Sequence, residues 1–479
     1  MHPLLFTAEN FTNPNNPDYR PEWWRDSVKH WNETLLWCGN LRDHEFKDLF
    51  LKEVAGEHPV DRQTRVDRTD PEPWFKDAVK DKASLFSQFT LAEDAPESVR
   101  ANEDNIDLQG TSLKQWALGP LKAFFRDGGA IIGADIDTEV RVGDRRPRLV
   151  WVPMRDIYWP EYRNYNGVDV WSKVSVRRSV TTVDANGRLQ AANQYWVYEL
   201  DDNRRCVLTV YLEEVRQGIR EQQFKVIKEP RIILDASNRP LTRLPFTDCL
   251  TVLSSLAMDA ESQIFSPLDD LLTLNIRHFN QESRKDTVEA KTAVPKPLVY
   301  SNKDDIGSNF YLGSGKVGVY NPEDRVEFLE LKGDSLPQLR QSIYDTETKI
   351  KARDNRLFAA GVSMTATEAN IENQKARVSL PGLIEIIESA FQDAFSIWES
   401  FANATPQDPI GGIEIDASVL DSPPNPAEIP AYLGTVNVGV PAEAIVNALK
   451  RKGFFTDEDF AGQSLQATAL PLDPNEVIQ

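Results

Sequence analysis

Two long amphipathic helices, separated by a short β-rich stretch, constrain the fold of this 479-residue chain more than any other feature of its sequence. The first is expected over residues 266–292, with Ser266 as N-cap and Pro267 at the first helical position. At 1.5 Å per residue it would be about 40 Å long. Beyond Phe279 it is polar nearly all round, which suits a rod packed against copies of itself better than a buried helix. Its apolar face consists of Leu268, Leu271, Leu272, Ile276 and Phe279.

The second long helix is expected over residues 336–357. Its apolar residues recur close to the heptad spacing, which is typical of a helix packed among helices. These residues are Leu336, Leu339, Ile343, Ile350 and Leu357. Between the two helices, residues 293–334 contain short apolar runs that predict a small β-rich insertion.

The insertion contains the sequence GSGK, which matches the end of a phosphate-binding loop. Its residues are Gly313, Ser314, Gly315 and Lys316. The full loop also needs a glycine at position 310 and a serine or threonine at 317 to hold Mg²⁺, and this chain has Phe310 and Val317. Because apolar residues alternate on both sides of the glycines, we expect a hairpin turn here and no nucleotide site.

The residues ahead of the paired helices predict helices followed by strands. Trp24, Val28, Trp31 and Leu35 have the three-to-four spacing of a buried helix face. A further helix is expected to start with Asp70 as its cap and Pro71 at its first position.

A third N-terminal helix should be capped by Thr111 or Ser112, interrupted at Gly119–Pro120 and ended by Gly128–Gly129. From Ala130 to about Pro245, alternating apolar residues and turn signals predict an antiparallel β region.

A third long helix is expected after the small-residue stretch FAAGVSMTATEAN, where Thr365 and Glu368 form a capping box. Pro381 must kink or break this helix. The sequence SPPNP at 422–426 resembles a linker, and two or three short helices should follow it. Together these elements predict an α+β protein. The apolar face after Pro381 is Leu383, Ile384, Ile387, Phe391, Ala394, Trp398 and Phe401.

Charge and cysteine content limit the possible functions. The net charge is −20, so the chain lacks the basic surface that holds nucleic acid tightly, although an acidic surface would let DNA slide past. Cys38, Cys206 and Cys249 are an odd number at wide spacing, which argues for a reducing compartment and against disulfides or a zinc site. No signal peptide and no transmembrane helix are expected from the sequence.

Motifs for catalysis or metal binding are missing from the sequence. There is no H-E-x-x-H, no C-x-x-C and no EF-hand loop. None of the five histidines stands beside an acid in a recognised motif, and the paired aspartates fall in turns or first helical turns. We therefore expect no catalytic residue, no metal and no cofactor, and we expect a component of an assembly. The histidines are His2, His30, His44, His58 and His278.

The order of these elements resembles the portal protein of tailed bacteriophages, the ring at one capsid vertex through which DNA is packaged and ejected. The resemblance covers residues 70 to 405 and includes the N-x-D-x-x-G segment at Asn105, Asp107 and Gly110. SPLDDLLTLNIRHFNQESRKD resembles the family's descending stem helix, and TAVPKPLVYS resembles the entry to its clip. DNRLFAAGVSMTATEA resembles its tunnel loop, which is followed by a kinked helix.

The resemblance implies a division of the chain. The implied domains are an N-terminal arm and wing at 1–245, the first stem helix region at 246–292, the clip at 293–334, the second stem helix at 335–355, the tunnel loop at 356–367, the kinked helix at 368–405 and a helical crown at 406–479.

The resemblance also implies specific contacts. The GSGK hairpin would lie at the clip surface that meets the terminase and later the adaptor, and Arg277, Arg284 and Lys285 on the stem are candidate positive contacts whose alternative is a solvated helix face. The segment that would project into the channel is Asp354, Asn355, Arg356, Leu357, Phe358, Ala359, Ala360, Gly361, Val362, Ser363 and Met364.

Portal subunits form closed rings, of twelve subunits in the virion, and have no enzymatic activity of their own. The implied partners are further copies of the chain, the terminase large subunit, a head-completion adaptor, the major capsid and scaffold proteins, and double-stranded DNA in transit. The implied location is the capsid vertex, after assembly in the host cytoplasm. Two alternatives stay open: another structural or head-completion protein of a virion, and a cytoplasmic enzyme with a β-rich fold.

Overall fold

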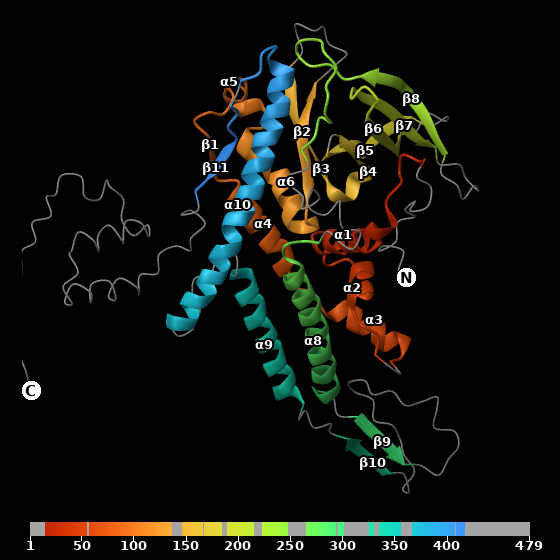
Figure 1. The fold of residues 1–479 in the computed structure, drawn as a ribbon. Helices are drawn as coiled ribbons and strands as arrows, with labels where there is room; N and C mark the ends of the chain where they lie inside the picture. Colours follow the sequence, from red (N-terminus) through yellow and green to blue (C-terminus); the bar gives the residue numbers. More distant parts are fainter. Residues whose placement is uncertain are drawn as a thin grey trace, which may run out of the picture.

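The chain folds into a mixed α+β body from which two long helices extend (Figure 1). No helix in the described part of the chain is long and apolar enough to cross a membrane. The computed structural model describes residues 15–54, 57–136, 146–165, 167–183, 189–214, 223–247, 265–293, 296–300, 325–329, 335–355, 366–407 and 409–416.

The N-terminal third is helical. Its α-helices are α1 (Arg25–Trp37), α2 (His44–Phe50), α3 (Pro59–Arg68), α4 (Trp74–Phe86), α5 (Glu97–Arg100) and α6 (Leu113–Asp127), and its 3-10 turns are η1 (Glu22–Trp24) and η2 (Glu103–Asn105). Trp24, Val28 and Trp31 are buried, as the spacing predicted, but Leu35 is 38% exposed. The expected burial of Leu35 was wrong, because it faces away from the other helices while Thr34 and Trp37 point inward.

Two predictions about helix boundaries were wrong. Helix α4 begins at Trp74 and not at Pro71, because Glu72 precedes Pro73 and a residue before proline is kept out of the helical region. Helix α6 is not interrupted at Gly119–Pro120 and continues to Asp127. The absence of a Cβ at Gly119 makes room for the Trp151 indole, which would lie 2.7 Å from a Cβ at that position. The expected ends hold: the Ser112 hydroxyl accepts from the Gln115 N–H at 3.4 Å, and Gly128 is left-handed.

The β region is antiparallel, as predicted. Strand β2 (Ala130–Ile136) pairs with β3 (Pro147–Pro153), and the 3-10 turn η4 (Met154–Asp156) leads from β3 into a five-stranded sheet. A short pairing of β1 (Phe89–Leu91) with β11 (Ile413–Ile415) joins distant parts of the chain. In order, the strands of the sheet are β4 (Ile157–Tyr165), β5 (Val168–Val183), β6 (Leu189–Leu200), β7 (Cys206–Glu214) and β8 (Gln223–Ile232).

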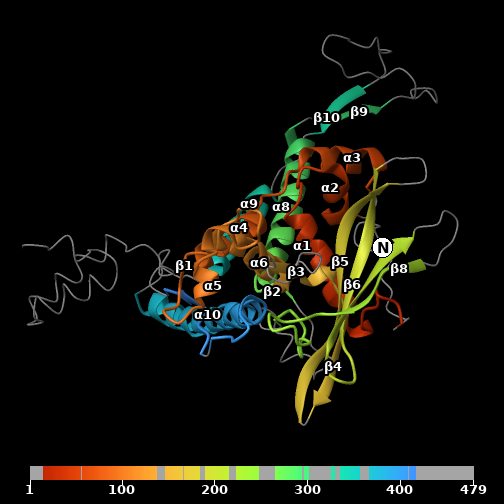
Figure 2. The ribbon, with the colours of Figure 1, turned by 90° about the horizontal axis from the view of Figure 1, so that it is seen from above.

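Three long helices complete the described chain: α8 (Asp269–Ala293), α9 (Leu336–Asn355) and α10 (Ala366–Ala402). Helix α10 packs on β2 with an apolar face that includes the buried Ile387, Phe391 and Trp398. Seen from above, the five-stranded sheet lies on the side of the helices away from α10 (Figure 2). Helix α10 passes through Pro381 as one element, so the chain does not break there. The expected apolar face was correct.

Candidate functional site

Helices α8 and α9 lie side by side and run antiparallel (Figure 1). The contacts between the two helices show this antiparallel alignment, because residues near the start of α8 contact residues near the end of α9, and the reverse holds at the other end. Arg353 pairs with Asp270 at 2.6 Å near the body, and Arg340 pairs with Glu289 at 3.0 Å near the far end. Between these ion pairs, the Gln281 amide donates to the Ser342 hydroxyl at 2.8 Å.

A β ladder stands at the far ends of the two helices (Figure 1). Strand β9 (Lys296–Tyr300) follows α8 and pairs antiparallel with β10 (Arg325–Leu329), which precedes α9. Two long helices therefore carry a small β element away from the body, as the sequence predicted. The assignment of these elements to a stem and a clip, and the domain boundaries drawn from the resemblance, remain predictions.

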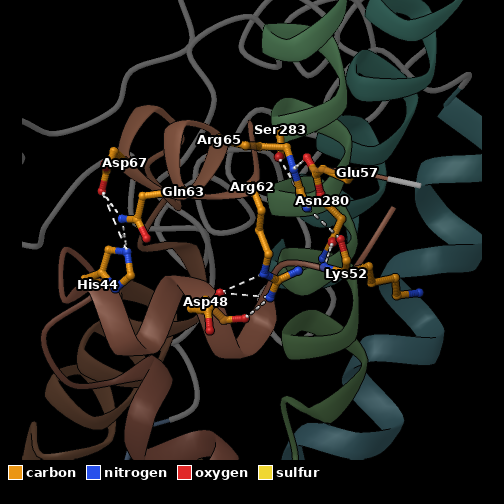
Figure 3. Close-up of polar contacts among 10 residues, drawn as sticks. All are labelled: His44, Asp48, Lys52, Glu57, Arg62, Gln63, Arg65, Asp67, Asn280 and Ser283. Carbon is orange, nitrogen blue, oxygen red and sulfur yellow. Dashed lines mark hydrogen bonds and ion pairs between the residues drawn. The ribbon is translucent and has the colours of Figure 1, made fainter. Parts of the chain in front are cut away.

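Side chains and backbone groups of the N-terminal helical region contact α8 (Figure 3). The Arg65 guanidinium in α3 makes a bidentate pair with Glu57 at 2.7 and 2.8 Å and holds the pKa of Glu57 below its ordinary value. The same guanidinium donates to the Ser283 hydroxyl of α8 at 3.1 Å. Arg65 is 6% exposed at its side chain, so this contact is shielded from water. The hydrogen bond from Arg65 to Ser283 thereby connects α3 to α8.

Two asparagines of α8 bind backbone groups of the helical region. The buried Asn275 accepts from the Phe75 N–H at 3.0 Å and donates to the Glu72 carbonyl at 3.1 Å. Five residues later, Asn280 accepts from the Lys52 N–H at 2.8 Å (Figure 3). Because helical N-termini leave backbone donors without intrahelical partners, Asn275 acts as a remote cap for α4. No local pattern predicts these roles, because the partners lie about two hundred residues away in the sequence.

The start of α8 is held by His30 of α1. The His30 Nε2 accepts from the Ser266 N–H at 3.0 Å, and Nδ1 lies 3.3 Å from the Asp269 carboxylate. Burial lowers the pKa of His30 to about 4, against the opposing effect of Asp127. The imidazole is therefore neutral at pH 7, with its proton on Nδ1. The expected start of this helix at Pro267 was wrong, because Ser266 caps a turn by accepting the Leu268 N–H and α8 starts at Asp269.

The predicted contact residues divide into two groups. On α8, Arg277 and Arg284 are exposed, whereas Lys285 donates to Glu282 and lies 3.8 Å from Asp286. Asp354 and Asn355 form the last turn of α9. The other residues of the expected tunnel loop, Arg356, Leu357, Phe358, Ala359, Ala360, Gly361, Val362, Ser363 and Met364, and the expected clip turn, Gly313, Ser314, Gly315 and Lys316, lie outside the described residues.

The N-x-D-x-x-G segment forms a compact turn. The Asn105 side chain accepts from the Gly110 N–H at 2.6 Å, and Asp107 accepts from the Gln109 N–H at 2.8 Å. Gly110 has a φ of 85°, which a residue with a side chain rarely adopts. The three motif residues therefore have a local structural role, which is sufficient to explain their spacing.

Among the residues that the structure describes, one group has metal-ligand chemistry. It is formed by His278 and Glu282, one turn apart on α8, with Glu347 of α9. The His278 Nε2 lies 3.4 Å from a Glu347 carboxylate oxygen and 3.9 Å from Glu282 Oε1. The four-residue spacing of His278 and Glu282 is visible in the sequence but is too common to mark a site, and Glu347 joins them only through helix packing.

Beside this group, a cavity of about 340 Å³ opens between α8 and α9. Its walls carry three carboxylates and two cations, and the side chain of Tyr344 at its edge is 63% exposed. The lining residues are Glu282, Lys285, Glu289, Arg340, Ile343, Tyr344 and Glu347.

Residues 267–402 match the family model of a domain of unknown function, DUF4055. The match covers α8, the β9–β10 ladder, α9 and α10, and ends where α10 ends. It covers less than a third of the chain and carries no functional description. No curated protein matches the chain.

Proposed function

We propose that this chain is the portal subunit of a tailed bacteriophage, which forms a closed ring that DNA passes through at one capsid vertex. The observation that carries the proposal is the antiparallel pair α8 and α9 with the β9–β10 ladder at its far end. A ring of such subunits would gather the helix pairs into a stem around the channel, with the ladders at one end. The terminase and the head-completion adaptor would dock at that end.

Charge supports the same proposal. A net charge of −20 disfavours tight binding to DNA, because attraction to phosphates would have to be overcome at each step of movement. The exposed Arg277 and Arg284 lie seven residues apart, so they occupy the same face of α8. In a ring they are candidates for the few positive contacts that follow the DNA backbone.

The test is the mass and shape of the purified full-length protein, measured by mass photometry and negative-stain imaging. Twelve chains of 54.2 kDa would give a particle of about 650 kDa, and cyclic closure would leave a central hole. The hole must admit duplex DNA, whose major groove alone is about 12 Å wide. A monomer or compact dimer at every protein and salt concentration would refute the ring.

A pair of matched variants tests whether the helix pair forms the ring contact. Tyr344 on α9 and Val60 on α3 are apolar residues with nearly equal exposure, 63% and 64%. Tyr344→Glu should reduce the fraction of rings, because the introduced charges would repeat around a stem. Val60→Glu should leave the rings intact. Equal behaviour of the two variants would exclude α9 from the ring contact.

A further inference from the structure

We propose that His278, Glu282 and Glu347 bind a divalent transition-metal ion, with Zn²⁺ as the best fit, and that the ion ties α8 to α9. Imidazole nitrogen and carboxylate oxygen are both donors that zinc binds, and three protein ligands would leave a fourth position open. Magnesium and calcium favour sites built from oxygen atoms alone, so the histidine selects against them. The site would be present in a single chain, whether or not the chain forms rings.

The separations between the three donor groups suit one tetrahedral ion. Two ligands that are each about 2.1 Å from zinc lie roughly 3.4 Å apart at the tetrahedral angle. The His278 Nε2 is 3.4 Å from the Glu347 oxygen and 3.9 Å from Glu282 Oε1, and all three donor atoms lie within 4.8 Å of one another. Small rotations of the two carboxylates would bring every donor to bonding distance.

The histidine is positioned for this role by its surroundings. The His278 side chain is 3% exposed, and its ring lies against the Trp74 indole with 4.8 Å between centroids. Its Nδ1 makes no hydrogen bond within the described residues, while Nε2 points to the two carboxylates. With an ion on Nε2 the ring proton would be on Nδ1, and Nε2 is the nitrogen that faces the two carboxylates.

Neighbouring groups complete the environment. Lys285 donates to Glu282 Oε2, which leaves Oε1 directed at His278 and orients the carboxylate as outer-shell partners do. The cavity of about 340 Å³ borders Glu282 and Glu347, so an ion can enter from solvent and a water molecule can take the fourth position. Arg340 is paired with Glu289 and does not contact the ligand atoms in the described structure.

The alternative is that the same three side chains only share hydrogen bonds, with a proton on His278 Nε2. Metal binding distinguishes the two, and the full-length protein stripped with EDTA is the sample. Isothermal titration with Zn²⁺ and elemental analysis after gel filtration should give one bound ion per chain. Titration with Co²⁺ should give the intense visible absorption of a tetrahedral site, and Mg²⁺ should not compete.

Variants locate the ion. Glu347→Gln should weaken zinc binding by more than the roughly 10–100-fold that the loss of an outer-shell partner costs. Glu289→Gln removes a carboxylate from the same cavity that is not a ligand, and His44→Gln removes a surface histidine, 48% exposed at its side chain. Both controls should bind zinc as the unaltered protein does.

Thermal unfolding measures whether the bound ion stabilises the packing of α8 against α9. Saturating Zn²⁺ should raise the Tm of the unaltered protein and of Glu289→Gln, and should leave the Tm of Glu347→Gln unchanged. Circular dichroism of each variant checks that it is folded. The proposal is overturned if the stripped protein takes up no zinc, or if Glu347→Gln binds it as tightly as Glu289→Gln does.

Discussion

The Asn275 side chain of α8 caps α4 by accepting the Phe75 N–H at 3.0 Å, across 200 residues of sequence. Asn275→Leu would leave this buried donor without a partner, which costs about 1–3 kcal/mol of unfolding free energy. We expect a loss of about 2 kcal/mol in urea unfolding. Thr273→Leu on the exposed face of α8 should change stability by less than about 0.5 kcal/mol. An equal effect of both variants would show that Asn275 has no capping role.

His30 should make stability depend on pH. Its folded pKa of about 4 is lower than the ordinary value of 6.5, so between these values the unfolded chain binds more protons. Stability therefore rises with pH across this window, and is lost as pH falls from 6.5 towards 4. At 1.36 kcal/mol per pKa unit, the contribution is about 3 kcal/mol.

The check is the urea midpoint of the unaltered protein and of His30→Gln between pH 4.5 and 7.5. The glutamine amide can still accept from the Ser266 N–H but does not titrate. The variant should show a flatter profile above pH 5, where most carboxylates are already charged. Parallel profiles would mean that His30 titrates normally in the folded protein.

The Arg65–Glu57 pair should matter more for stability than an exposed pair. Its side chains are 6% and 11% exposed, so Arg65→Met would leave the Glu57 carboxylate without its ion-pair partner and remove the contact to Ser283. We expect a loss of about 3 kcal/mol. The control is Arg25→Met, which breaks a pair to Glu22 with side chains 58% and 76% exposed. That variant should lose less than about 0.5 kcal/mol by chemical denaturation.

Two glycine-to-alanine changes should have opposite signs. A Cβ on Gly133 of β2 would lie 2.0 Å from the Pro245 carbonyl oxygen and 2.9 Å from the Phe246 Cα. Because both obstacles are backbone atoms, Gly133→Ala should cost about 2–3 kcal/mol. A Cβ on Gly382 of α10 meets nothing within 4 Å, so Gly382→Ala should stabilise the helix by up to about 1 kcal/mol. Thermal unfolding of both variants gives the comparison, and a neutral Gly133→Ala would contradict the tight approach.

Local patterns predicted much of the fold correctly. The apolar spacing of α8, α9 and the second half of α10, the Gly128 cap and the antiparallel strands all agree with the structure. One failure came from a local rule that was missed, because Pro73 keeps Glu72 out of the helical region and α4 starts at Trp74. Gly119 and Pro120 were expected to interrupt a helix, but α6 is continuous through both, and the absence of a Cβ at Gly119 makes room for the Trp151 indole.

The sequence by itself determined the type and approximate extent of the long helices, because apolar periodicity acts within a few residues. Tertiary structure decided which of their side chains meet. Glu347 reaches His278, and Arg65 reaches Ser283, only after helices far apart in the chain have packed at one alignment. That alignment depends on the summed contacts of both helices, and no single local pattern records it.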